Sequence, residues 1–161
     1  NLLGIGNPHY NFNCGFTPFL PEKGAVALIS QAGANMLGAL GASQLRHYGL
    51  SFFAGLGNKA DVDFSEFMLY AKEDPYTRCI ALYMEGMDSP DAFIDACRKI
   101  VRDKPVVVIK VGGSKQGAKA AMRHTASVNI GRASTTSMFG RRLITSLTTN
   151  RFSATCGLRV A

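Results

Sequence analysis

The chain has 161 residues, of which 47% are hydrophobic, and a formal net charge of +7. This length supports one domain with a substantial core and excludes two complete ones. No uninterrupted apolar run approaches the roughly 20 residues of a membrane helix, and no signal segment opens the chain, so we expect a soluble protein with no membrane partner.

The positive charge lies mainly in the last part of the sequence. Residues 1–130 contain 13 Lys and Arg against 11 Asp and Glu, and the other +5 comes from five arginines in residues 131–161. This excess is dispersed and lacks interleaved aromatic residues, so it does not indicate a nucleic-acid partner.

The four cysteines show no CxxC or metal-ligand spacing. Cys79 and Cys97 lie inside apolar patterns, where cysteine behaves as a small hydrophobic residue. We therefore predict no metal site and a reduced, cytoplasmic setting. The chain begins at Asn1 without an initiator methionine, as expected of a processed chain or an excised fragment.

Strand and helix patterns alternate along the body of the chain. Continuous apolar runs predict four strands, AVALIS (25–30), LSFFAGLG (50–57), RCIALYMEG (78–86) and PVVVIKVG (105–112). Helical spacing and capping signals predict three intervening helices, over 33–49, 63–74 and 89–104.

Two of the helices have recognisable first turns. Asp63 and Glu66 have the spacing of a capping box, and Ser89 with Pro90 is typical of a helix start. Apolar strands that alternate with helices favour a mainly parallel sheet with right-handed crossovers and helices on both faces. The predicted fold class is α/β, a flavodoxin-like or Rossmann-like three-layer sandwich.

Ligands of such sheets bind beyond the carboxyl ends of the strands. Each loop at that edge contains glycine beside polar residues: SQAGAN (30–35), GLGNKADVD (55–63), YMEGMDS (83–89) and KVGGSKQGAK (110–119). The turn Ser30, Gln31, Ala32 and Gly33 is a candidate phosphate cradle, because a helix N-terminus attracts anions. The alternative is an ordinary glycine turn of an α/β fold.

Side chains on the same edge are candidates for chemistry. Glu85 could orient an imidazole or could be a solvated loop residue, and His124 follows the glycine loop that contains Gly112 and Gly113. Imidazole is well suited to carry a phosphoryl group or a proton near neutral pH. We interpret the other two histidines, His9 and His47, as structural.

The loop after the second predicted strand supplies three further candidates, Gly57, Asn58 and Lys59. Instead of belonging to a functional site, Lys59 and Asp61 could equally form an ion pair or a helix cap. The sequence by itself leaves both interpretations of this loop open.

Three stretches, taken in order, resemble a known family: PEKGAVALISQAGA, FFAGLGNKADVDFSEFMLYAKEDPYTRCIALYMEGM and CRKIVRDKPVVVIKVGGSKQGAKAAMRHTAS. They are similar to the second domain of nucleoside-diphosphate-forming acyl-CoA synthetases, such as ADP-forming acetyl-CoA synthetase, relatives of the succinyl-CoA synthetase α subunit. The resemblance implies a leader (1–23), a flavodoxin-like CoA-ligase domain (24–127) and a Ser/Thr/Arg-rich closing segment of uncertain structure (128–161).

The resemblance also implies roles for residues. His124 aligns with the histidine that the family phosphorylates, and Glu85 with the glutamate that orients it. Residues 30–33 fall at the helix whose N-terminus cradles the phosphoryl group. This sequence departs from the family pattern at Ala32, where serine is common, and at Arg123 and Ala126 beside the histidine.

The implied reaction is the reversible conversion of acyl-CoA, phosphate and a nucleoside diphosphate to acid, CoA and triphosphate. CoA and ATP or ADP with Mg²⁺ are expected as substrates, with no tightly bound cofactor. A CoA-binding Rossmann domain and an ATP-grasp domain are expected as partners in an oligomer. Two alternatives remain open: a non-catalytic relative, such as the regulatory domain of a protein acyltransferase, and a plain α/β ligand-binding module.

Overall fold

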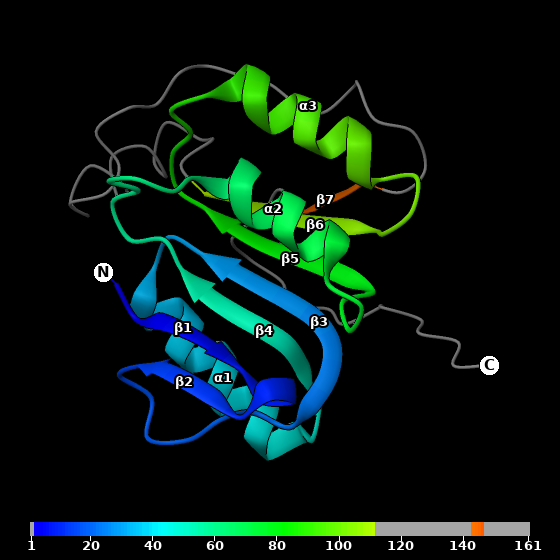
Figure 1. The fold of residues 1–161 in the computed structure, drawn as a ribbon. Helices are drawn as coiled ribbons and strands as arrows, with labels where there is room; N and C mark the ends of the chain where they lie inside the picture. Colours follow the sequence, from blue (N-terminus) through cyan, green and yellow to red (C-terminus); the bar gives the residue numbers. More distant parts are fainter. Residues whose placement is uncertain (1, 112–142, 147–161) are drawn as a thin grey trace.

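One mixed sheet runs through the protein, which a computed structural model describes at residues 2–111 and 143–146 (Figure 1). Its strands in these residues are β1 (Gly4–Asn7), β2 (Phe12–Gly15), β3 (Lys23–Ser30), β4 (Leu50–Gly55), β5 (Cys79–Met84), β6 (Val106–Lys110) and β7 (Leu143–Ser146). They lie in the order β2-β1-β4-β3-β5-β6-β7.

The four predicted strands form the centre of the sheet. β3 pairs in parallel with both β4 and β5, and β5 pairs in parallel with β6. A short helix of the 3-10 type, η1 (Pro8–Tyr10), and three α-helices accompany the strands: α1 (Gly33–Arg46), α2 (Phe64–Glu73) and α3 (Pro90–Ile100). Figure 1 shows α2 and α3 on one face and α1 on the other, which confirms the predicted three-layer α/β sandwich with a mainly parallel sheet.

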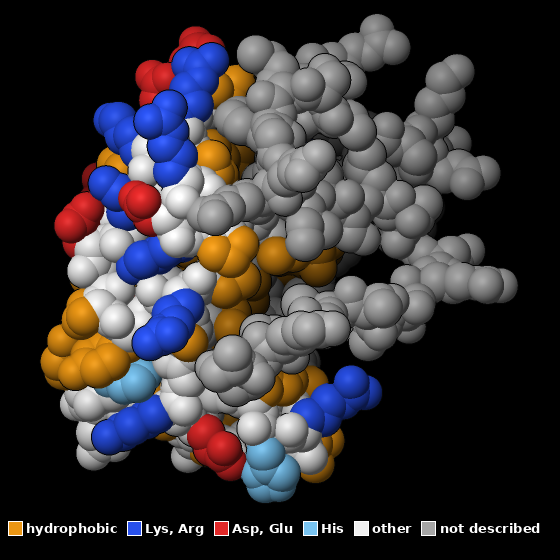
Figure 2. Space-filling model, turned by 90° about the vertical axis from the view of Figure 1, so that its right-hand side faces the viewer, with side chains coloured by type: hydrophobic (Ala, Val, Ile, Leu, Met, Phe, Trp, Pro, Cys, Tyr) orange, Lys and Arg blue, Asp and Glu red, His pale blue; other side chains and the backbone are white. Residues whose placement is uncertain are grey.

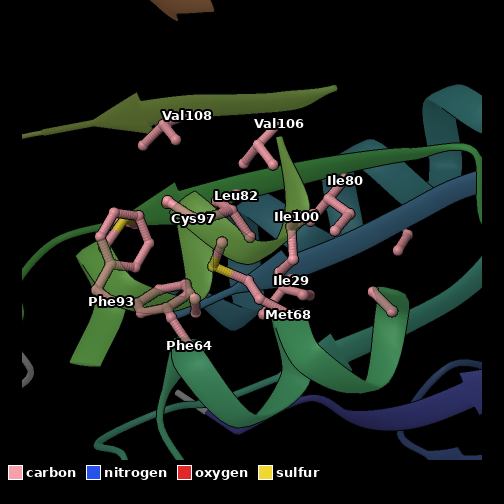
Figure 3. Close-up of a cluster of buried hydrophobic side chains, with 14 of the residues drawn as sticks. Ile29, Phe64, Met68, Ile80, Leu82, Phe93, Cys97, Ile100, Val106 and Val108 are labelled. Atoms are coloured by element: carbon pink, nitrogen blue, oxygen red, sulfur yellow. The ribbon is translucent and has the colours of Figure 1, made fainter. Parts of the chain in front are cut away.

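The first face of the sheet carries the larger core. Figure 3 shows Phe64 and Met68 of α2, and Phe93, Cys97 and Ile100 of α3, against apolar side chains of the central strands. A smaller cluster on the opposite face joins Met36 and Leu40 of α1 to Leu3, Leu50 and Phe53. The strands are apolar on both faces because helices cover both.

The helix boundaries follow the local signals in the sequence. α2 begins with the predicted capping box, in which the Asp63 carboxylate accepts from the backbone N–H of Glu66 and Glu66 Oε2 accepts from Asp63 N at 3.0 Å. Asp63 Oδ1 also accepts from Phe64 N at 2.7 Å. α3 begins after Ser89 with Pro90 in its first turn, although the Ser89 hydroxyl makes no capping bond. α1 ends at Arg46, three residues before the predicted end, because His47 adopts a left-handed conformation with φ 54°.

Strands also form in the two terminal segments. Residues 4–15 of the expected leader form a hairpin, β1 and β2, which joins the sheet through antiparallel pairing of β1 with β4. Within residues 128–161, β7 pairs in parallel with β6. The sheet therefore extends beyond the four central strands on both sides.

The described surface carries charges of both signs. Figure 2 shows Lys and Arg side chains interspersed with Asp and Glu on the face that it presents, with apolar side chains between them. None of the described helices combines the length and the apolar character needed to cross a membrane.

Candidate functional site

The loops that follow the central strands meet at one edge of the sheet, here called the carboxyl edge. Backbone hydrogen bonds join them, because Leu56 N donates to Ser30 O at 2.8 Å and Gln31 N donates to Tyr83 O at 3.1 Å. Val111 N likewise donates to Met84 O at 2.9 Å. The residues after β3, β4, β5 and β6 thus lie side by side at the edge where an α/β sheet usually binds its ligand.

The N-terminus of α1 lies on this edge. Ser30, which is 1% exposed, makes a tight turn in which its hydroxyl accepts from Ala32 N at 3.1 Å and donates to Ala32 O at 3.0 Å. Ala32 is the N-cap residue and supplies no side-chain capping bond. The partial positive charge of the 14-residue helix is therefore not reduced by a capping oxygen, which suits an anion.

Gln31 connects this turn to the loop after β5. Its side chain is fully buried, and Oε1 accepts hydrogen bonds from Glu85 N at 2.7 Å and from Gly86 N at 3.0 Å. Its amide nitrogen Nε2 is buried without a hydrogen-bond partner among the described residues. The structure thus brings together residues 30–33 and Glu85, which the sequence predicted for the same edge.

Glu85 follows the last residue of β5 and is only 5% exposed. Its carboxylate affects the pKa values of two neighbours, Tyr83 and Lys110. Burial raises the pKa of the Tyr83 phenol, and Glu85 raises this pKa further, whereas a hydrogen bond with Asn35 lowers it. Burial lowers the pKa of Lys110, an effect that Glu85 opposes and Lys59 reinforces. A carboxylate and two ammonium groups therefore share this part of the edge.

Lys59 is the predicted loop residue with the strongest contacts. Its ammonium group lies 2.6 Å from Asp88 Oδ2 and 3.7 Å from Asp63 Oδ1, and its side chain is 4% exposed. It also donates to Gly86 O at 3.4 Å. Lys59 therefore links the cap of α2 to the loop after β5. The carboxylates beside it are those of Asp63 and Asp88, whereas the sequence prediction names Asp61.

The other residues of this loop have different surroundings. Gly57 is buried and has a positive φ of 54°, a conformation that side chains rarely adopt, whereas Asn58 is exposed. Within the described residues, no group of three or more His, Cys, Asp or Glu side chains could hold a metal ion.

Lys110 is a residue of this edge that was not among the sequence-predicted candidates. Its ammonium group donates to Glu85 O at 2.7 Å and to Val111 O at 2.8 Å. The only signal in the sequence is a lysine at the end of an apolar strand, and the candidates predicted in the loop that follows are Gly112 and Gly113. Gly112, Gly113 and His124 lie outside the described residues.

The two other histidines have structural surroundings. His47 follows the last residue of α1, the opposite end of that helix from the carboxyl edge, and its Nδ1 lies 2.9 Å from Glu22 Oε1. His9 Nε2 lies 2.8 Å from Gly24 O, and its ring stacks on Tyr76 with the centroids 3.9 Å apart. Both arrangements fit the structural interpretation.

The amino-acid sequence matches the family model of the succinyl-CoA ligase like flavodoxin domain over residues 23–149. It is 42% identical to the ADP-forming acetate–CoA ligase I of Archaeoglobus fulgidus, over 80% of this chain and 19% of that protein. It is 38% identical to the α subunit of the ADP-forming acetate–CoA ligase I of Pyrococcus furiosus, over 80% of this chain and 28% of that subunit.

A solved structure shows the same similarity. The dinucleotide-forming acetyl-coenzyme A synthetase 1 of Ca. Korarchaeum cryptofilum, in complex with phosphate and ADP, superimposes with a TM-score of 0.72 and 34% identity. The match covers 81% of this chain and 29% of that one. This chain therefore spans less than a third of the length of these relatives.

Proposed function

Because the chain belongs to the family of succinyl-CoA ligase like flavodoxin domains, as its sequence implied, we propose that it carries the phosphohistidine of a nucleoside-diphosphate-forming acyl-CoA synthetase. The complete reaction converts acyl-CoA, phosphate and a nucleoside diphosphate to acid, CoA and nucleoside triphosphate, and it is reversible. His124 is the residue that receives and releases the phosphoryl group.

One observation carries this proposal most directly. The buried Gln31 side chain joins the uncapped N-terminus of α1 to the buried residue Glu85. A helix end that attracts anions and a carboxylate that can hold an imidazole therefore lie at the same edge. The first group would stabilise the phosphoryl group of a phosphorylated histidine, and the second would orient its ring.

Each group has a role in the transfer. The Glu85 carboxylate accepts a hydrogen bond from one ring nitrogen of His124, which fixes the tautomer and leaves the lone pair of the other nitrogen to attack phosphorus. The bond from phosphorus to its leaving oxygen breaks as the nitrogen–phosphorus bond forms. The product carries about two negative charges, which the amides of the α1 N-terminus offset.

The substrates and partners belong to the same proposal. CoA and ATP or ADP with Mg²⁺ bind to a CoA-binding Rossmann domain and an ATP-grasp domain that act with this chain in an oligomer. This agrees with relatives that are several times longer than the matched region and with a structural neighbour that holds phosphate and ADP. We propose a cytoplasmic location, where these substrates are found.

Phosphorylation with labelled nucleotide tests the function. Assembled with its CoA-binding and ATP-grasp partners, the protein is expected to take up the γ-phosphoryl group of a nucleoside triphosphate. A phosphoryl group on imidazole is stable in base and lost in acid, so the label is measured after each treatment. A complete absence of label would favour the non-catalytic alternative, for which Ala32 in the cradle is the supporting departure.

Glu85→Gln is expected to slow both the appearance and the turnover of the label by roughly 100-fold, the scale of a positioned acid–base group. Glutamine fills the same space but supplies no negative charge to stabilise the imidazole proton. The matched control is Glu73→Gln at the end of α2, an exposed glutamate away from the edge, which should label at the normal rate. A Glu85→Gln protein that labels as fast as the unmodified protein would remove Glu85 from the mechanism.

A further inference from the structure

The side chain of Gln31 continues the hydrogen-bond ladder between β3 and β5 beyond the end of β3. Backbone pairing runs to Ser30 opposite Tyr83, and Gln31 N then donates to Tyr83 O at 3.1 Å. At this point the main chain turns into α1. Beyond this point the acceptor is the side-chain carbonyl of Gln31. It accepts hydrogen bonds from the two backbone amides that follow β5, Glu85 N and Gly86 N.

Side chains also hold the carbonyl groups of the same two residues. Lys110 Nζ donates to Glu85 O at 2.7 Å, and Lys59 Nζ donates to Gly86 O at 3.4 Å. All four polar backbone groups of Glu85 and Gly86 are therefore bonded to side chains, which come from the ends of β3 and β6 and from the loop after β4. Backbone groups usually bond to other backbone groups, so this arrangement is unusual.

We propose that Gln31 is a positioning residue of the phosphoryl transfer, which acts by fixing the backbone from which the Glu85 carboxylate extends. This inference rests on the proposed function, because Glu85 must orient His124 for its position to matter. Among the three side chains, Gln31 alone holds both amides, and it is fully buried.

The bonding of the Gln31 side chain supports a positioning role. Gln31 Nε2 is a buried donor without a partner among the described residues, so the described bonds of this side chain are the two that Oε1 accepts. Since a misplacement of about 1 Å can reduce a rate by about 100-fold, a rigid backbone at Glu85 has a direct effect on catalysis.

Gln31→Met tests the inference, because methionine has a similar shape but no hydrogen-bonding amide. In the protein assembled with its partners, we expect phosphohistidine formation to slow by about 10- to 100-fold. Hydrogen exchange of the Glu85 and Gly86 amides is expected to accelerate in the same variant.

The matched control is Gln44→Met in α1, the helix that follows Gln31. Gln44 Nε2 donates to Leu20 O at 2.8 Å, so this change also removes a side-chain bond to the backbone, but away from the carboxyl edge. Label should form at the normal rate in this variant. If Gln31→Met folds poorly, Gln31→Asn serves instead, because asparagine keeps the amide and is too short to reach both N–H groups. A Gln31→Asn protein that labels at the normal rate would overturn the inference.

A double-mutant cycle with Glu85→Gln separates positioning from a general structural effect. If Gln31 acts through Glu85, adding Gln31→Met to Glu85→Gln slows labelling by no more than about threefold beyond Glu85→Gln alone. If the double variant instead slows by the product of the two single-variant factors, Gln31 and Glu85 act independently and the inference is overturned. Labelling that persists in His124→Asn would refute the proposed function itself. If His124→Asn takes up no label but Gln31→Met labels at the normal rate, only this inference is refuted.

Discussion

Replacement of His124 by asparagine is expected to abolish the acid-labile phosphate completely. The attacking group is the in-plane lone pair of a neutral imidazole nitrogen, whereas the nitrogen of an amide has its lone pair delocalised into the carbonyl group and is not a nucleophile. No residual rate is expected from other groups of the site, because they bind and orient the phosphoryl group without accepting it. The measurement is label incorporation from nucleoside triphosphate with all partners present.

His47→Asn is the matched control for this change. His47 lies next to Glu22 just beyond the far end of α1, away from the carboxyl edge, so its loss should leave the label unchanged. Full labelling of the His124→Asn protein would end the phosphohistidine interpretation. Loss of label in His47→Asn as well would point to a general defect in assembly.

Phe53→Ala is expected to lower the free energy of unfolding by about 3–5 kcal/mol, the usual range for removal of a buried aromatic side chain. Phe53 is 0% exposed in β4 and packs with Leu3, Leu50 and two residues of α1 in the smaller core cluster. The loss is large against the 5–15 kcal/mol that is typical of a whole domain.

Phe16→Ala makes the same chemical change at an exposed position and serves as the control. Phe16 is 87% exposed, so its removal should change stability by less than about 0.5 kcal/mol. Urea unfolding of both variants measures the difference. Equal stabilities of Phe53→Ala and Phe16→Ala would mean that the α1 face of the sheet does not contribute as described.

Several parts of the fold could be predicted because their signals are local. The four central strands are continuous apolar runs, and the first turn of α2 is fixed by Asp63 and Glu66, which are three residues apart. The hairpin of β1 and β2 was not predicted, because its strands have four residues each and lack an apolar pattern. Its place depends on pairing with β4, which is distant in sequence.

The candidate site was predictable to a similar extent. The rule that ligands bind at the carboxyl ends of parallel strands placed residues 30–33 and Glu85 at one edge, as the structure has them. The part played by the Gln31 side chain was not predictable, because its partners lie 54 and 55 residues further along the chain. The role of His124 stays a prediction, since this residue lies outside the described part of the chain.

The sequence by itself determined the fold class, the family and the edge at which the candidate residues gather, because strand and helix periods, capping spacings and family motifs are all written in neighbouring residues. Only the tertiary structure decided how Glu85 is held. Gln31, Lys59 and Lys110 reach the backbone of Glu85 and Gly86 from three different loops or strand ends. Such bonds depend on the distances between separate strands once the sheet has formed, and no local pattern in the sequence specifies those distances.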